Sequence, residues 1–167
     1  MSARMKIDEP DLGYQARGLY YGGRWVEATS GRTFASINPS TGSKLGDVPY
    51  ADAQDVDLAV KAAAKGFAEW RKVGIKERAK CLEAWAKRVR SEAKRLALID
   101  AVDSGNAVKG MEGDMHWAAD SLEYFAGLIT EVKGTTSSQG SRHLNFTRRQ
   151  PYGVVAKLNA FNHPFRF

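Results

Sequence analysis

Apolar and polar positions near the start of the chain indicate two short β-hairpins. In residues 19–26, two apolar runs flank Gly22 and Gly23, a two-residue signal for a tight hairpin turn. In residues 34–48, two further runs flank the segment 38–42, whose Asn, Pro, Ser, Thr and Gly favour a turn. The sequence therefore predicts a small antiparallel β region before the first helix.

Residues 52–70 are predicted to form the first helix. Asp52 suits the N-cap, and Asp55 follows three residues later, close to a capping-box arrangement. Apolar side chains recur at i, i+3, i+4 and i+7, which is the spacing of one helix face. These side chains are Val56, Ala59, Val60, Ala63, Phe67 and Trp70.

Two more helical regions follow, so that three main helical regions are predicted. The second covers residues 75–103, and an interruption within it is one possibility. Its apolar stripe consists of Leu82, Trp85, Val89, Ala93 and Leu96. The third begins near Asp114, a candidate cap, and ends before Gly134. Residues predicted on one face of it are Trp117, Ser121, Phe125, Leu128 and Val132.

The last part of the chain has the pattern of strands. Residues 143–148 alternate as an edge strand does. Residues 152–158 form an apolar run after Pro151, which predicts a buried parallel strand. Parallel strands need neighbours, which βαβ crossovers usually supply, and the sequence after this run is too short to contain one. The pattern is therefore that of the opening of an incomplete α/β domain.

Composition fits an ordinary globular protein. The 167 residues are 43% hydrophobic and 26% charged, which suits a single domain with a real core. No apolar run is long enough to span a membrane, and residues 1–18, predicted to be a flexible tail, lack the apolar core of a signal peptide. The single cysteine excludes an intramolecular disulfide framework. The default expectation is a cytoplasmic protein without a membrane partner.

The formal net charge of +6 is concentrated in one segment. Residues 71–95 contain ten Lys or Arg against three Glu. A basic segment can bind phosphates, and a nucleic-acid-binding domain is therefore one alternative. The charges, however, project away from the apolar stripe and lack interleaved exposed aromatic residues. A solvated helix face is the favoured interpretation, and no nucleic acid partner is expected.

Few residues form a pattern with chemical meaning on their own. Cys81 has no histidine within a helical turn, which favours an incidental cysteine over a nucleophile. Gly105 and Gly110 have the spacing of a phosphate loop but lack the Lys and Ser/Thr that must follow. The histidines lie far apart without the spacing of metal ligands, so no metal site is expected: they are His116, His143 and His163.

Asn162 occupies a more informative position. It follows the predicted parallel strand, and α/β folds place ligands at the carboxyl ends of such strands. An amide there can donate a hydrogen bond to a developing oxyanion. Asn close to a turn proline is also common without any function, and the pattern of residues alone leaves both interpretations open.

Several motifs in order add a resemblance. The strongest is Pro151-Tyr152-Gly153-Val154-Val155 followed by Phe161-Asn162-His163-Pro164. Weaker ones are residues 19–26, 30–34, 37–42, 55–70 and 123–127. Together they resemble the opening of the NAD(P)-dependent aldehyde dehydrogenases, with a Pro-x-Gly-Val strand leading to an aromatic-Asn-x-Pro loop. Their order and spacing agree over residues 19–167.

The resemblance implies a fold and an organisation. The fold class is α/β, an incomplete Rossmann-like cofactor domain of the aldehyde dehydrogenase fold. Residues 19–135 and 151–167 would form part of the cofactor-binding domain, and residues 152–158 the first strand of its sheet. Residues 136–150 would be strands of an oligomerisation arm that packs against a neighbouring subunit. A homo-oligomer, or self-association, is therefore expected.

The resemblance also implies a reaction and its residues. Family members oxidise an aldehyde to a carboxylic acid with NAD or NADP through a cysteine thiohemiacetal. Asn162 matches the residue that stabilises the oxyanion. The segment whose backbone lies along the cofactor matches Leu158, Asn159, Ala160 and Phe161. Trp117 and Ser121 match positions of the substrate tunnel.

The chain departs from the family pattern in decisive places. The motifs that carry the catalytic cysteine and the general-base glutamate are absent from these 167 residues, and Cys81 does not match the nucleophile. We therefore expect this chain alone to be inactive and its binding of NAD(P) to be doubtful. The alternatives are a non-catalytic oligomerisation or interaction module and, less favoured, the nucleic-acid-binding domain. Neither the aldehyde nor the choice of NAD or NADP follows from the sequence.

Overall fold

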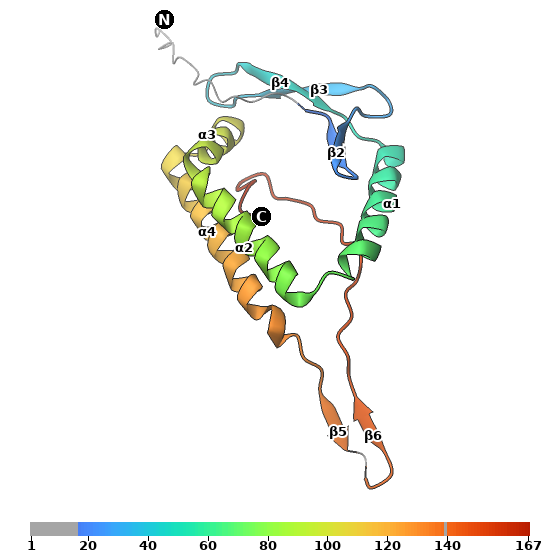
Figure 1. Ribbon diagram of the computed structural model, residues 1–167. Helices are drawn as coiled ribbons and strands as arrows, with labels where there is room; N and C mark the ends of the chain where they lie inside the picture. Colours follow the sequence, from blue (N-terminus) through green and yellow to red (C-terminus); the bar gives the residue numbers. More distant parts are fainter. Residues whose placement is uncertain (1–16, 139) are drawn as a thin grey trace, which may run out of the picture.

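A computed structural model describes residues 17–138 and 140–167 (Figure 1). Two hairpins come first, then helices, a third hairpin and a C-terminal segment without regular structure. The strands are β1 (Leu19–Tyr21), β2 (Arg24–Val26), β3 (Thr33–Ile37), β4 (Lys44–Pro49), β5 (Thr136–Ser138) and β6 (Leu144–Phe146). The helices are α1 (Ala53–Trp70), α2 (Ile75–Ser91), α3 (Ala93–Ser104), α4 (Val108–Leu128) and the short 3₁₀-helix η1 (Ile129–Glu131).

The two N-terminal hairpins are confirmed. β1 and β2 pair antiparallel, and the turn between them places Gly22 at φ 62° and Gly23 at φ 78°. A two-residue turn of this kind needs positive φ at both positions, which glycine adopts without steric cost. β3 and β4 also pair antiparallel, with a register shift between Ser36 and Ile37.

The start of α1 is fixed as the sequence predicts. The Asp52 carboxylate accepts hydrogen bonds from the amides of Gln54 and Asp55, and the Asp55 carboxylate accepts one from the Asp52 amide. Asp55 is buried and also accepts bonds from the amide and hydroxyl of Thr29. The hydroxyl bond from Thr29 is the main cause that lowers the pKa of Asp55. The capping box therefore fixes the start of α1, and the two bonds from Thr29 tie this end of the helix to the loop after β2.

The main core lies between the helices, where α4 packs along α2 and α3 (Figure 1). It consists of small and flexible side chains: Ala86, Val89, Ala93, Ala97, Ala101, Met111, Met115 and Ala119. Alanine at such positions allows two helix backbones to approach closely, and methionine fills the remaining gaps. The predicted interruption of the second helical region is confirmed at Glu92, between α2 and α3.

One sequence expectation for the helices is wrong. Asp114 does not cap the third helix, because α4 starts earlier, at Val108, and Asp114 lies buried within it. Within the apolar stripe of the second helical region, Val89 and Ala93 are buried, whereas Trp85 is 58% exposed. Trp117 and Phe125, which were predicted to share one face of the third helix, are exposed, because α4 packs through its Met and Ala face. Both α2 and α4 carry apolar residues on more than one face, and the shape of the neighbouring helix decides which face is buried.

The third hairpin projects away from the helices (Figure 1). β5 and β6 pair antiparallel, and their described residues are all exposed. At the base, the Thr147 amide donates to the Thr135 carbonyl at 2.8 Å, and the Thr135 amide donates to the Thr147 hydroxyl at 2.8 Å. The predicted edge strand is thus present as Leu144–Phe146, shorter than expected.

The predicted buried strand at residues 152–158 does not form. The described segment is irregular, Tyr152 is 96% exposed and Leu158 is 95% exposed. A parallel strand is stabilised by ladder hydrogen bonds to neighbours and by cover on both faces, and no described strand lies in register with this segment. The chain instead runs from β6 past α1 and crosses to the helix pair (Figure 1).

Candidate functional site

The C-terminal loop, residues 162–167, is held on the helices by polar side chains. The Asn106 amide group, from the turn between α3 and α4, donates to the main-chain carbonyl of Asn162 at 2.7 Å. The Asp100 carboxylate of α3 accepts a hydrogen bond from the Phe165 amide at 3.3 Å. Both contacts involve the main chain of the loop, so they fix its path without depending on which side chains it carries.

Asp114 provides the other anchor, through two side chains of the loop. One carboxylate oxygen lies 2.5 Å from His163 Nδ1, and the other accepts a hydrogen bond from the Arg166 guanidinium at 3.4 Å. Asp114 is buried, whereas His163 and Arg166 are partly exposed. A buried carboxylate is stabilised only by such partners, and the loop supplies them.

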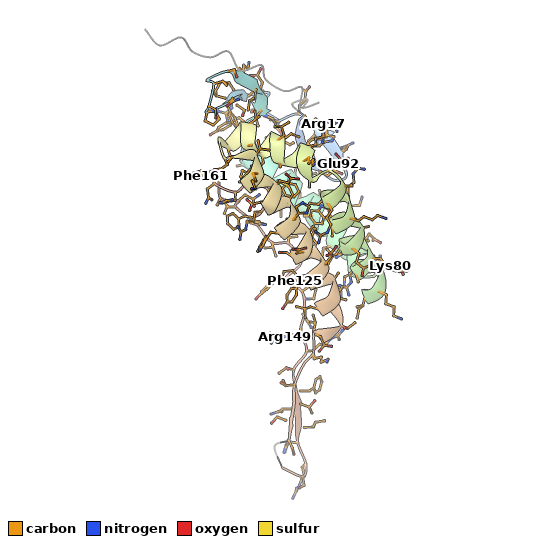
Figure 2. The ribbon with its side chains drawn as sticks, turned by 90° about the vertical axis from the view of Figure 1, so that its left-hand side faces the viewer. Arg17, Lys80, Glu92, Phe125, Arg149 and Phe161 are labelled. Atoms are coloured by element: carbon orange, nitrogen blue, oxygen red, sulfur yellow. The ribbon has the colours of Figure 1, made fainter. Side chains whose placement is uncertain are left out.

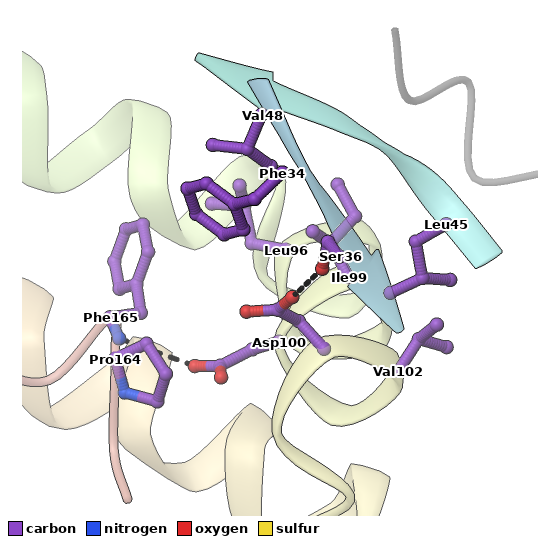
Figure 3. Close-up of a pocket in the computed structure, with 11 residues that line it drawn as sticks. Phe34, Ser36, Leu45, Val48, Leu96, Ile99, Asp100, Val102, Pro164 and Phe165 are labelled. Atoms are coloured by element: carbon purple, nitrogen blue, oxygen red, sulfur yellow. Dashed lines mark hydrogen bonds between the residues drawn. The ribbon is translucent and has the colours of Figure 1, made fainter. Parts of the chain in front are cut away.

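Asp100 is an unusual member of this site because only one of its oxygens has a partner. The other, Oδ1, is buried without a hydrogen bond among the described residues. Burial is the main cause that raises the pKa of Asp100. Figure 3 shows Asp100 beside a cavity of about 470 Å³ between the β3–β4 hairpin, α3 and the loop. Across this cavity, the Ser36 hydroxyl donates to the Asp103 carboxylate at 3.0 Å.

A second cavity, of about 430 Å³, lies between α2, α4 and the C-terminal loop. Its walls include Trp85 from α2, Trp117 and Ser121 from α4, and Asn159 and Arg166 from the C-terminal segment. The Ser121 hydroxyl donates to the Trp117 carbonyl at 3.0 Å, so this hydroxyl is directed along its own helix. We call this space the tryptophan cavity.

The fold therefore brings Trp117, Ser121 and Asn159 together around one space. Leu158, Ala160, Phe161 and Asn162 are exposed and lie outside the described lining of the tryptophan cavity. Phe161 projects on the side of α4 opposite to Lys80 of α2 (Figure 2).

Comparison with known proteins decides the family. The sequence model of the aldehyde dehydrogenase family matches residues 25–167, which is most of the chain. The chain belongs to the aldehyde dehydrogenase family. Its fold is that of the opening part of this family's α/β structure, as the solved relatives show.

Three relatives illustrate the extent of the match. Aldehyde dehydrogenase tropH of Talaromyces stipitatus is 39% identical over 152 residues, which are 89% of this chain and 30% of that protein. The structure of PnpE from Pseudomonas sp. WBC-3 superposes with a TM-score of 0.86 at 32% identity, covering 91% of this chain and 31% of that one. PnpE in complex with nicotinamide adenine dinucleotide gives a TM-score of 0.78 at 31% identity, covering 82% and 28%. The chain thus spans about a third of the length of these aldehyde dehydrogenases.

Residues 158–161, expected from the family resemblance to lie along the cofactor, are exposed. Within the described chain, no main-chain hydrogen bond outside the helices and strands uses these residues, so their N–H and C=O groups can face a bound dinucleotide. The Cys81 side chain lies exposed on α2 and lines neither cavity described above.

Sequence reasoning missed the three residues that anchor the loop: Asp100, Asn106 and Asp114. A signal for two of them exists, since Asp100 and Asp114 interrupt the buried Ala and Met faces of α3 and α4. A carboxylate among buried helix positions has to find a partner. The described residues contain no group of three or more His, Cys, Asp or Glu suited to a metal ion, and no described helix is long and apolar enough to cross a membrane.

Proposed function

We propose that this chain is the N-terminal part of an oxidoreductase that oxidises an aldehyde to a carboxylic acid with NAD or NADP. The observation that carries the proposal is the docking of the Asn162 loop on α3 and α4, beside the tryptophan cavity. Family membership supports the same reaction class. In the working enzyme, the Asn162 amide donates a hydrogen bond to the oxygen of the aldehyde as negative charge develops on it.

The other site residues take positioning roles in this proposal. The exposed main chain of residues 158–161 lies along the cofactor, which when bound accepts a hydride from the substrate carbon. Trp117 and Ser121 form the wall of the substrate passage. The nucleophilic cysteine and the general base come from sequence outside this chain, so the 167-residue chain alone does not oxidise aldehydes.

A chimaera tests this proposal. Residues 17–167 replace the matching third of PnpE, which then supplies its own remaining sequence. The chimaera is expected to reduce NAD or NADP in the presence of aldehydes, whereas the 167-residue chain alone gives no reduced cofactor above the blank. Replacing Asn162 with Ala in the chimaera should lower kcat by about 10²–10³-fold, the usual effect of losing one oxyanion donor. A folded chimaera without activity, or one indifferent to Asn162→Ala, contradicts the proposal.

The exposed β5–β6 hairpin favours a second role, as an oligomerisation arm. Unpaired strand edges recruit other chains, and each described residue of this hairpin is open to solvent. A non-catalytic interaction module built on the same hairpin is the alternative function. Light scattering of the full chain and of a chain lacking residues 136–146 tests the arm, because association should require the hairpin in both cases. Activity of the chimaera separates the two cases, since only the enzyme requires it.

In this proposal the basic segment, residues 71–95, binds neither nucleic acid nor a membrane surface. Several of its cations are paired: Lys80 with Glu77, Arg88 with Glu92, and Arg90 with Asp120 and Glu123. Lys80 projects from α2 away from α4, as a solvated residue does (Figure 2). A cytoplasmic location accords with this proposal.

A further inference from the structure

The lining of the tryptophan cavity combines aromatic rings with positive charge. Its aromatic side chains come from three elements: Trp85 from α2, Trp117 and Phe125 from α4, and Phe165 and Phe167 from the C-terminal loop. Its charged side chains are Lys157 and Arg166, and the described lining contains no Asp or Glu. A space of about 430 Å³ with apolar walls and a few polar groups is typical of a small-molecule site.

Arg166 is oriented by the cavity wall. Its guanidinium carbon lies 4.4 Å from the centre of the Trp117 ring and 5.9 Å from that of Phe167, both within cation–π range. The contact with Asp114 uses Nη1 at 3.4 Å, a long hydrogen bond that engages one of the five N–H donors of the guanidinium. The Arg166 Nε is buried without a partner among the described residues.

These contacts leave Arg166 ready to bind an anion. The contacts with the two aromatic rings restrict the side chain of Arg166, so that less rotamer freedom is lost when a carboxylate binds to its remaining donors. Asp114 offsets part of the charge of Arg166, but it does not line the cavity, and Lys157 adds a second cation to the wall. The electrostatic balance of the lining therefore favours a negative ligand group.

We propose that the tryptophan cavity selects an aldehyde that carries an aromatic body and a carboxylate, with Arg166 as the residue that determines this specificity. The inference rests on the proposed function for the aldehyde group, whereas the preference for an aromatic anion stands on the lining alone. The flat body lies between the rings of Trp85 and Trp117, and the carboxylate accepts hydrogen bonds from Arg166.

Three probes of nearly equal shape test the charge preference: benzoate, benzamide and benzamidine. They are titrated into the 167-residue chain, and binding is followed by the change in tryptophan fluorescence, with Trp117→Phe to assign the signal. Benzoate is expected to bind about tenfold more tightly than neutral benzamide, with cationic benzamidine weakest, because a charge-assisted hydrogen bond contributes roughly this factor. Equal affinity for benzoate and benzamide, or no binding of any probe, overturns the proposal.

Variants identify the residue responsible. Arg166→Gln should abolish the preference for benzoate, and Arg166→Lys should keep part of it, because the charge remains and the planar fork is lost. Arg142→Gln, an exposed arginine before β6, is the matched control and should change nothing. If Arg166→Gln loosens the loop, as a lower melting temperature would show, Lys157→Gln provides the second test and should reduce the preference without that effect. A preference that survives both substitutions overturns the proposal.

The chimaera separates this inference from the proposed function. In the chimaera with the wild-type loop, kcat/KM should be higher for 4-carboxybenzaldehyde than for benzaldehyde. Arg166→Gln should remove this difference. Benzoate selectivity without oxidation of either aldehyde refutes the proposed function and leaves the cavity preference intact. Oxidation of both aldehydes with equal kcat/KM refutes the cavity preference and leaves the proposed function intact.

Discussion

Asp114 contacts two side chains of the C-terminal loop, and its removal should release that loop without unfolding the helices. Asp114→Asn keeps the size of the side chain and removes its charge. The lost contacts are the one with His163 at 2.5 Å and the one with Arg166 at 3.4 Å. Both partners of Asp114 belong to the loop. The substitution therefore leaves the helix core of Ala and Met side chains intact.

The magnitude follows from the burial of the three groups. Hydrogen bonds to charged groups contribute about 1.5–3 kcal/mol each when well formed. His163 and Arg166 are each about a third exposed, which screens their interaction with Asp114, and Asn retains one acceptor oxygen. We therefore expect a loss of about 2 kcal/mol in the docking of the loop, equivalent to roughly a 30-fold increase in its opening.

Native-state amide exchange measures this opening directly. The Phe165 amide, which donates to Asp100, and the Arg166 amide, which donates to the His163 carbonyl, are reporters inside the loop. Their exchange should become about 30-fold faster in Asp114→Asn, while amides of the helix core keep their protection. Asp120→Asn is the matched control on the same helix, since Asp120 is exposed and Arg90 keeps Glu123 as a partner.

Two outcomes would refute this reasoning. Unchanged exchange at the loop amides would mean that Asp114 does not hold the loop. Equal acceleration in the loop and in α3 and α4 would mean that Asp114 stabilises the helix pair itself rather than the docked segment.

Further predictions concern two aspartates and one apolar residue. Asp100→Asn should raise the melting temperature at neutral pH, because burial raises the pKa of Asp100 and the charged form is therefore unfavourable in the fold. That gain should shrink as the pH falls below the ordinary range of an aspartate, where Asp100 is protonated in both states. Thr29→Val removes the main cause that lowers the pKa of Asp55, so an NMR titration should show a higher pKa for this carboxyl. The wild-type protein gains stability from the lowered pKa at a pH above the unfolded pKa and loses it in acid, and the variant should lack part of this gain. Val155→Lys should decrease the self-association measured by light scattering, because Val155 is 71% exposed and a charge there opposes pairing of the segment with another chain.

Local signals in the sequence suffice for the elements that depend on local contacts. Gly22 and Gly23 predict the first hairpin because only positive φ closes a two-residue turn, and Asp52 with Asp55 predicts the start of α1 because a capping box lies within one turn. The start of α4 has no such mark. No side chain caps it, and Asp114, a residue type that favours N-caps, lies further along the helix and proved misleading.

Contacts between distant segments could not be predicted in the same way. The apolar pattern of residues 152–158 is that of a parallel strand, but a pattern cannot supply the neighbouring strands on which such a structure depends. The exposed face of α4 also carries apolar residues, Trp117 and Phe125, and the docking of α2 and α3 decides which face is buried. Family resemblance identified Trp117, Ser121 and Asn159 individually, and the fold alone shows that they share a cavity.

The order of dependence within the site follows from these contacts. The loop that carries Asn162 is docked although the strand expected before it is absent, so its position does not derive from a sheet. It derives from Asp100, Asn106 and Asp114, which are fixed by the packing of α3 and α4. Since α4 also forms a wall of the tryptophan cavity, any change that shifts α4 against α3 is expected to displace both the docked loop and that cavity. The helix pair is therefore the element on which the geometry of the proposed active site depends.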